Sequence, residues 1–123
     1  MNNPSGRPGP PQTHHVTIDY DGTTLSAEPE DLVGVFPRDT VEWSCADHPW
    51  AIQFVGEGRP GSSERRFPPL DRQSARGGPG EAGSVRVQPG ARLGEQWEYV
   101  VTVWDADKGE VITLDPDIVI GHR

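Results

Sequence analysis

The sequence predicts an all-β domain, a Greek-key β-sandwich of about seven to eight short strands. Runs in which apolar and polar residues alternate recur along the chain, and this period of two is that of a half-buried strand. Val, Ile and Trp recur while Met occurs once, a balance that favours strands over helices. The 15 Gly and 13 Pro residues supply turn signals between the runs. A chain of 123 residues has the length of one domain.

Residues 1–13 are expected to be a disordered tail, with the sandwich over residues 14–123. The tail is rich in Pro and Gly and has no apolar run. Burial therefore cannot offset the conformational entropy that ordering it would cost.

The first half of the domain contains several patterns that predict strands. Val16, Ile18 and Tyr20 alternate with polar residues, as in a strand with one buried face. Pro29 is tolerated in the first turn of a helix, so a single helical turn is expected over residues 29–32. The expected strands cover residues 15–20, 25–27, 33–35, 41–43 and 50–54.

Residues 56–83 are expected to form one long loop, rich in Gly, Pro and Arg. The stretch shows neither a strand nor a helix period. It is too long for an ordinary connection, which indicates that it is either functional or mobile. Its basic residues are Arg59, Arg65, Arg66, Arg72 and Arg76.

The last part of the chain predicts the closing strands of the sandwich. In the longest of them, Tyr99, Val101 and Val103 fall on one face and Trp104 falls on the other. The residues between this strand and the next predict a hairpin turn. The expected closing strands cover residues 84–88, 95–104, 111–114 and 117–120.

The charge and the cysteine content exclude several classes of function. The formal net charge is −8 at pH 7, so the domain repels phosphate backbones and gains nothing from an anionic membrane surface. The single cysteine, Cys45, excludes an intramolecular disulfide. No apolar run resembles a signal peptide, and none approaches the ~20 residues of a membrane helix. The expected location is therefore the cytoplasm, with neither nucleic acid nor membrane as a partner.

Val41-Glu42-Trp43 followed by the segment from Pro49 to Phe54 resembles the cupredoxins, the plastocyanin and azurin fold. Many members place Val-x-Trp before a Pro-His-x-aliphatic-x-Phe strand. Pro37-Arg38-Asp39-Thr40 stands where Pro-Gly-Asp-Thr is usual in that family. Residues 99–103 and 115–120 are similar to its last strands, so the resemblance implies a cupredoxin-like sandwich.

The resemblance covers about residues 15–121, but the copper ligands of the family are missing. Trp50 stands where the first copper histidine would fall. The family's second site segment supplies a Cys, a His and often a Met, whereas residues 101–107 contain none of these. A blue-copper site needs two His and one Cys with a weak axial ligand. The resemblance therefore implies a copper-free protein, and no cofactor is expected.

Two short clusters carry residue types that ligate metals. Cys45 and His48 lie three apart, as zinc-binding pairs do, but a zinc site normally has four ligands. Asp105 and Asp107 have the oxygen density of a calcium loop. The favoured interpretation is a thiol and a polar loop residue in the first cluster, and a hairpin turn in the second. These four residues remain the candidates if the protein binds Zn or Ca.

The expected function is a non-catalytic interaction or scaffolding module with a protein partner. The long loop is weakly positive while the rest of the chain is strongly negative, and loops on rigid scaffolds carry function. Arg65 and Arg66 precede Phe67 and Leu70 in this loop, and an apolar anchor ringed by charge is typical of interfaces. Trp104 joins them because exposed Trp is enriched in binding hot spots. No catalytic residue is expected, and the alternatives are a metal-binding protein or a carbohydrate-binding module.

Overall fold

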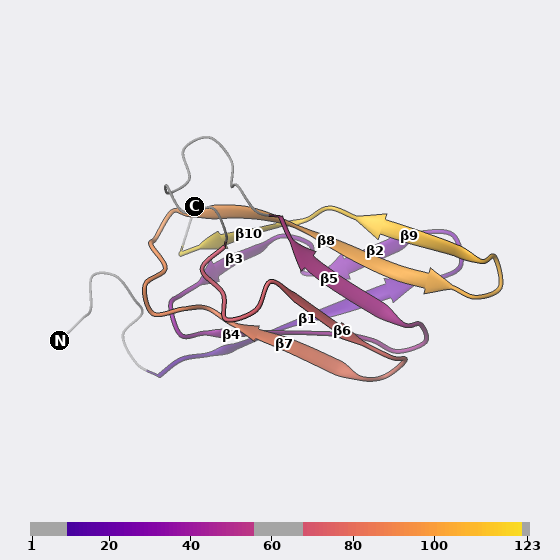
Figure 1. Cartoon of the computed structure of the whole chain (residues 1–123), viewed down its shortest axis with the longest axis horizontal. Helices are drawn as coiled ribbons and strands as arrows, with labels where there is room; N and C mark the ends of the chain where they lie inside the picture. Colours follow the sequence, from indigo (N-terminus) through magenta and orange to yellow (C-terminus); the bar gives the residue numbers. More distant parts are fainter. Residues whose placement is uncertain (1–9, 56–67, 122–123) are drawn as a thin grey trace.

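The computed structural model describes residues 10–55 and 68–121, which form an all-β sandwich of two sheets (Figure 1). One sheet has four strands and the other has six. Among the described residues there is no helix of the length and apolarity needed to cross a membrane. In chain order the strands are β1 (Thr13–Tyr20), β2 (Leu25–Glu28), β3 (Leu32–Val35), β4 (Thr40–Cys45), β5 (Trp50–Phe54), β6 (Ser74–Gly77), β7 (Ala82–Arg86), β8 (Gln96–Asp105), β9 (Glu110–Leu114) and β10 (Asp117–Ile120).

The four-stranded sheet has the order β2-β1-β4-β7. β1 runs antiparallel to β2 and parallel to β4, with Val16 opposite Trp43. β7 lies antiparallel to β4 at the edge, with Val85 opposite Val41. Every second side chain of β1 is buried from Val16 onward, because the apolar residues match the period of a strand. The buried residues of β1 are Val16, Ile18 and Tyr20.

The six-stranded sheet has the order β3-β10-β8-β5-β6, and β9 also pairs with β8. β8 organises this sheet because it is ten residues long and has partners along both edges. β5 pairs along one edge, while β10 and β9 share the other. Asp115-Pro116 separates β9 from β10, and the proline interrupts the ladder because it has no N–H to donate.

The core lies between the two sheets and contains a cluster of three aromatic rings. Trp43 of β4 meets Phe54 and Tyr99 of the other sheet edge-on, with ring centroids 6.0 and 5.7 Å apart. Aromatic pairs of this kind contribute ~0.5–1.5 kcal/mol each beyond the burial of their surface. The inward-facing residues Trp97, Tyr99, Val101 and Val103 of β8 are at most 1% exposed.

Two local expectations near the N-terminus are wrong. The helical turn expected over residues 29–32 is absent: residues 29–31 form a bend. β3 begins at Leu32, whose side chain is buried in the core. β1 begins at Thr13, inside the segment expected to be a tail, because the backbone just before it is held by two hydrogen bonds of Gln12. The Gln12 N–H donates to Asp39 Oδ1 at 3.0 Å, and the Gln12 carbonyl accepts from Thr40 N–H at 2.9 Å. Residues 1–9 lie outside the described residues.

The loop expected over residues 56–83 is wrong for its second part. Residues 56–67 are outside the described part of the chain, but β6 and most of β7 occupy the rest. β6 pairs with β5 and β7 pairs with β4, so this hairpin passes from one sheet to the other and joins them at one side. The sequence Ser-Ala-Arg-Gly of β6 has no apolar alternation, which is why this strand, one of ten among the described residues, was not predicted.

Candidate functional site

Cys45 and His48 lie at the turn between β4 and β5, where both take part in packing. Cys45 is 2% exposed, and its carbonyl accepts a hydrogen bond from Gly80 N–H at 2.8 Å. The His48 ring meets the Tyr20 ring edge-on, with centroids 5.1 Å apart. In the part of the chain that the structure describes, no three His, Cys, Asp or Glu side chains are grouped so that they could hold a metal ion.

The Asp105 carboxylate, 4% exposed, is an acceptor at the turn between β8 and β9. Its Oδ2 accepts from the Tyr20 hydroxyl at 2.7 Å, and its Oδ1 accepts from Lys108 N–H at 3.0 Å. The Lys108 ammonium donates to the Gly22 carbonyl at 2.6 Å, so the tip of this hairpin is attached to the turn after β1. Asp107 is exposed in the same turn. Both Asp105 oxygens are thus engaged in a structural contact, which we call the Tyr20–Asp105 latch.

The Tyr20–Asp105 latch shifts the pKa of both groups. The Tyr20 hydroxyl and then the Lys108 N–H lower the pKa of Asp105 below its ordinary value of 3.8. The hydrogen bond to Asp105, followed by burial, raises the pKa of Tyr20 from 10.0 to about 12. The contribution of Asp105 to stability is therefore present above pH 3.8 and lost as the pH falls through its lowered pKa. That of Tyr20 is present below pH 10.0 and lost as the pH rises through about 12.

Tyr20→Phe is expected to flatten the pH dependence of stability at both ends. The variant lacks the hydroxyl that contributes most to lowering the pKa of Asp105, and it has no phenol at position 20 to ionise. Urea unfolding followed by tryptophan fluorescence, across the acid and alkaline ranges, measures the difference. The wild type should lose stability more steeply than the variant below pH 3.8 and above pH 10.0. Parallel curves for the two proteins would contradict the latch.

Trp50 occupies the position where the cupredoxin resemblance places a copper histidine, and its indole is buried against the β6–β7 hairpin. It is 3% exposed, and its Nε1 donates to the Glu81 carbonyl at 3.0 Å. A Cβ added to Gly77 would lie 2.7 Å from Trp50 Nε1, and one added to Gly83 would lie 3.0 Å from the indole ring. The indole therefore lies over two glycines whose lack of a side chain makes room for it.

Of the predicted partner-binding residues, Trp104 lies on the surface and Leu70 does not. Leu70 is 2% exposed, so its side chain packs in the core and is not available to anchor a partner. Arg65, Arg66 and Phe67 lie outside the described residues. Trp104 is 43% exposed, as its place opposite the buried face of β8 predicts.

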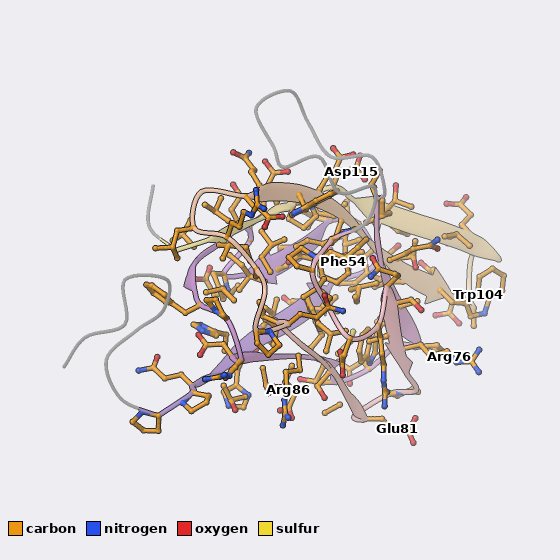
Figure 2. All side chains as sticks on the ribbon, turned by 60° about the vertical axis from the view of Figure 1, so that its left-hand side comes forward. Phe54, Arg76, Glu81, Arg86, Trp104 and Asp115 are labelled. Carbon is orange, nitrogen blue, oxygen red and sulfur yellow. The ribbon has the colours of Figure 1, made fainter. Side chains whose placement is uncertain are left out.

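Trp104 belongs to the outer face of the six-stranded sheet, meaning the side of β5, β6, β8 and β9 that is turned away from the core. Its cross-strand neighbour on β9 is Val111, which is 60% exposed. Thr102, two residues earlier on β8, is opposite Ala51 of β5, and Ala51 is opposite Arg76 of β6. Figure 2 shows Arg76 and Trp104 both pointing away from the body of the domain. One row of outward side chains therefore crosses from β8 to β6 beside the Trp104–Val111 pair.

A depression of about 960 Å³ lies between β5, β6 and β8, reaches Gly83 and Ser84 of β7, and includes much of this outer face. Ser74 and Arg76 alternate along β6, so their side chains are directed to the same side of the sheet, and Arg72, which precedes β6, lines the same depression. Among the lining residues that the structure describes, none is Asp or Glu. The outward-facing part of the lining includes Ala51, Gln53, Arg72, Ser74, Arg76 and Thr102.

Sequence reasoning placed Arg72 and Arg76 among the basic residues of the expected loop but assigned a role to neither. No apolar alternation marks the segment that contains them, so no local signal in the sequence indicated their place beside β5. Val111 was read only as part of a returning strand, and its exposure depends on what lies beyond the sheet.

No protein-family model and no curated protein matches this chain. The fold is therefore described as an all-β two-sheet sandwich. The features that bear on function are the outer face of the six-stranded sheet and the hydrogen bonds of the buried carboxylates.

Proposed function

We propose that this domain is a non-catalytic, copper-free, cupredoxin-like module that binds a protein partner through the outer face of its six-stranded sheet. The observation that carries the proposal is the exposed Trp104–Val111 pair. Trp43, Trp50 and Trp97 are at most 3% exposed, whereas Trp104 is 43% exposed. Exposed tryptophan next to an aliphatic side chain is a common centre of protein interfaces, because both lose water on contact.

The use of the buried carboxylates supports binding rather than catalysis. Asp39, Glu95 and Asp105 are the buried acidic residues of the described chain, each at most 4% exposed. Glu95 accepts from Arg92 N–H at 2.8 Å and from Trp97 Nε1 at 3.1 Å. Asp39 and Asp105 likewise accept from neighbouring donors. A carboxylate committed to fixed donors holds turns in place and is poorly suited to proton transfer with a substrate.

The order of segments along the chain supports the cupredoxin likeness. The Val-x-Trp segment lies on β4 and the segment from Pro49 to Phe54 leads into and forms β5. These two strands lie in different sheets and face each other through Trp43 and Phe54. The long strand β8 then pairs with β5, as expected for a closing strand of one sandwich. Trp50 in place of a histidine supports the absence of copper from this likeness.

Trp104→Ala is the test of the proposed interface. The variant should fold with a stability within about 1 kcal/mol of the wild type, because half-exposed surface residues contribute little to folding. It should lose ~2 kcal/mol or more of binding energy for the partner, as truncation of a hot-spot residue does. The partner is first identified by chemical cross-linking in the native host, and its affinity is then measured by calorimetry.

Val33→Ala is the matched control for this test, since Val33 is 48% exposed on β3, at the opposite edge of the six-stranded sheet from β6. It should leave the affinity unchanged. Equal affinity of the wild type and Trp104→Ala would refute the proposed interface. Quenching of Trp104 fluorescence by oligosaccharides, with no protein cross-linked, would instead favour the carbohydrate-binding alternative.

A further inference from the structure

We propose that the depression between β5, β6 and β8 binds an acidic segment of the protein partner, with Arg72 and Arg76 holding its carboxylates. This inference rests on the proposed function and names the chemistry of the partner. The domain has a formal net charge of −8, yet the described lining of the depression contains two Arg and neither Asp nor Glu. The depression therefore differs in sign from the molecule around it, which is the condition for charge complementarity with an acidic ligand.

Neither Arg72 nor Arg76 forms an ion pair with another described residue. Both side chains are exposed. Arg76 also borders a second hollow of about 370 Å³ that includes Glu81, but Glu81 Oε1 accepts a hydrogen bond from Gly78 N–H at 2.6 Å. With respect to the described residues, both guanidinium groups are thus available to an outside carboxylate, which a planar guanidinium binds through two parallel hydrogen bonds.

The shape of the depression fits a peptide better than a small anion. Ala51, Ser74 and Thr102 are small residues between and beside the arginines, so backbone can approach the sheet closely. Arg72 and Arg76 are four residues apart and the chain bends at Gln73, so their Cα atoms are separated by less than the ~13 Å of a fully extended segment. An extended partner would therefore present carboxylates no more than about four residues apart to reach both.

The charge of the whole domain favours a protein segment over a nucleic acid. A polynucleotide brings one charge per phosphate, and a domain of net charge −8 repels the phosphates that extend beyond the depression. An acidic peptide carries fewer charges and adds side chains that make apolar contact. Trp104 and Val111 lie beside the depression on the same face and offer that contact.

Phage display of random peptides against the full chain tests the inference. Peptides of about twelve residues extend to ~40 Å, which exceeds the separation of Arg72 and Arg76 along the chain. The enriched peptides are expected to be acidic, with two Asp or Glu no more than about four residues apart. Enrichment of neutral or basic peptides would overturn the inference and leave the proposed function standing. Absence of any enrichment would count against both.

Combining Arg72→Gln with Arg76→Gln then locates the site. This variant should bind the most enriched peptide about tenfold more weakly at low salt, and the difference should shrink as salt is raised. The matched control is Arg92→Gln, because Arg92 is exposed in the segment before β8 and does not line the depression. The control should bind like the wild type. An unchanged affinity in the double variant, or tighter binding of a single-stranded DNA oligonucleotide than of the peptide at this site, would overturn the assignment.

Discussion

Replacing Asp39 by alanine is expected to lower the free energy of unfolding by about 3–5 kcal/mol. The carboxylate is fully buried at the end of the turn that leads into β4. Its Oδ1 accepts from Gln12 N–H at 3.0 Å, and its Oδ2 accepts from Phe36 N–H at 3.0 Å. His14 Nε2 lies 2.8 Å from the same Oδ2. Alanine would leave these donors without their acceptor and would detach the start of β1 from the turn between β3 and β4.

Chemical unfolding at neutral pH measures the effect of Asp39→Ala, and Asp19→Ala is the control. Asp19 lies on β1, the strand whose start Asp39 holds, but the side chain of Asp19 is exposed. Its loss should therefore change stability by less than ~0.5 kcal/mol. Asp39→Asn should fall between the two, because its amide keeps one acceptor oxygen but presents an N–H₂ group to the remaining donors. Equal stability of Asp39→Ala and Asp19→Ala would mean that water satisfies the freed donors.

The alternation of apolar residues was enough to predict most of the strands. It placed Val16, Ile18 and Tyr20 on the buried face of β1, and it separated Trp104 from the buried face of β8, as the structure confirms. These strands each bury one face against the other sheet, so their period of two is enforced by packing and remains visible in the sequence. β6 was not predicted because it does not meet that condition.

β6 is held by its neighbours rather than by its own apolar residues. Its residues pair with β5 from Trp50 to Gln53, and the Trp50 indole covers the hairpin that follows. Ala75 is its one residue packed against the core. Such a strand is defined by long-range pairing, which a local pattern does not encode.

The candidate site was predictable only in part for the same reason. Trp104 was identified because its exposure follows from its own strand. Leu70 was assigned to the surface because an apolar residue that follows two prolines carries no periodic signal, whereas its bridge to Val87 buries it. Arg76 and Thr102 flank Ala51 because of the registers in which β5 pairs with β6 and with β8. Registers between distant segments are set by tertiary packing, so the sequence pattern alone did not indicate this arrangement.

Gly77→Ala is expected to destabilise the domain by about 1–3 kcal/mol, the usual cost of adding a methyl group to a closely packed site. The new Cβ would lie 2.7 Å from Trp50 Nε1 and 2.8 Å from the Glu81 carbonyl oxygen. These two atoms form a hydrogen bond 3.0 Å long, so the methyl group would push against both of its partners. The indole would have to move from its place over the β6–β7 hairpin, which joins the two sheets.

A double-mutant cycle with Trp50→Phe shows whether this contact is the cause. The smaller ring lacks Nε1, so adding Gly77→Ala to Trp50→Phe should cost at least ~1 kcal/mol less than adding it to the wild type. Gly90→Ala is the control, since a Cβ at Gly90 meets nothing within 4 Å, and it should be neutral or slightly stabilising by restricting the unfolded chain. Additive effects of Gly77→Ala and Trp50→Phe in urea unfolding would show that Gly77 is required for another reason. Non-additive effects would identify the packing of Trp50 on Gly77 as the contact that the added methyl group disrupts.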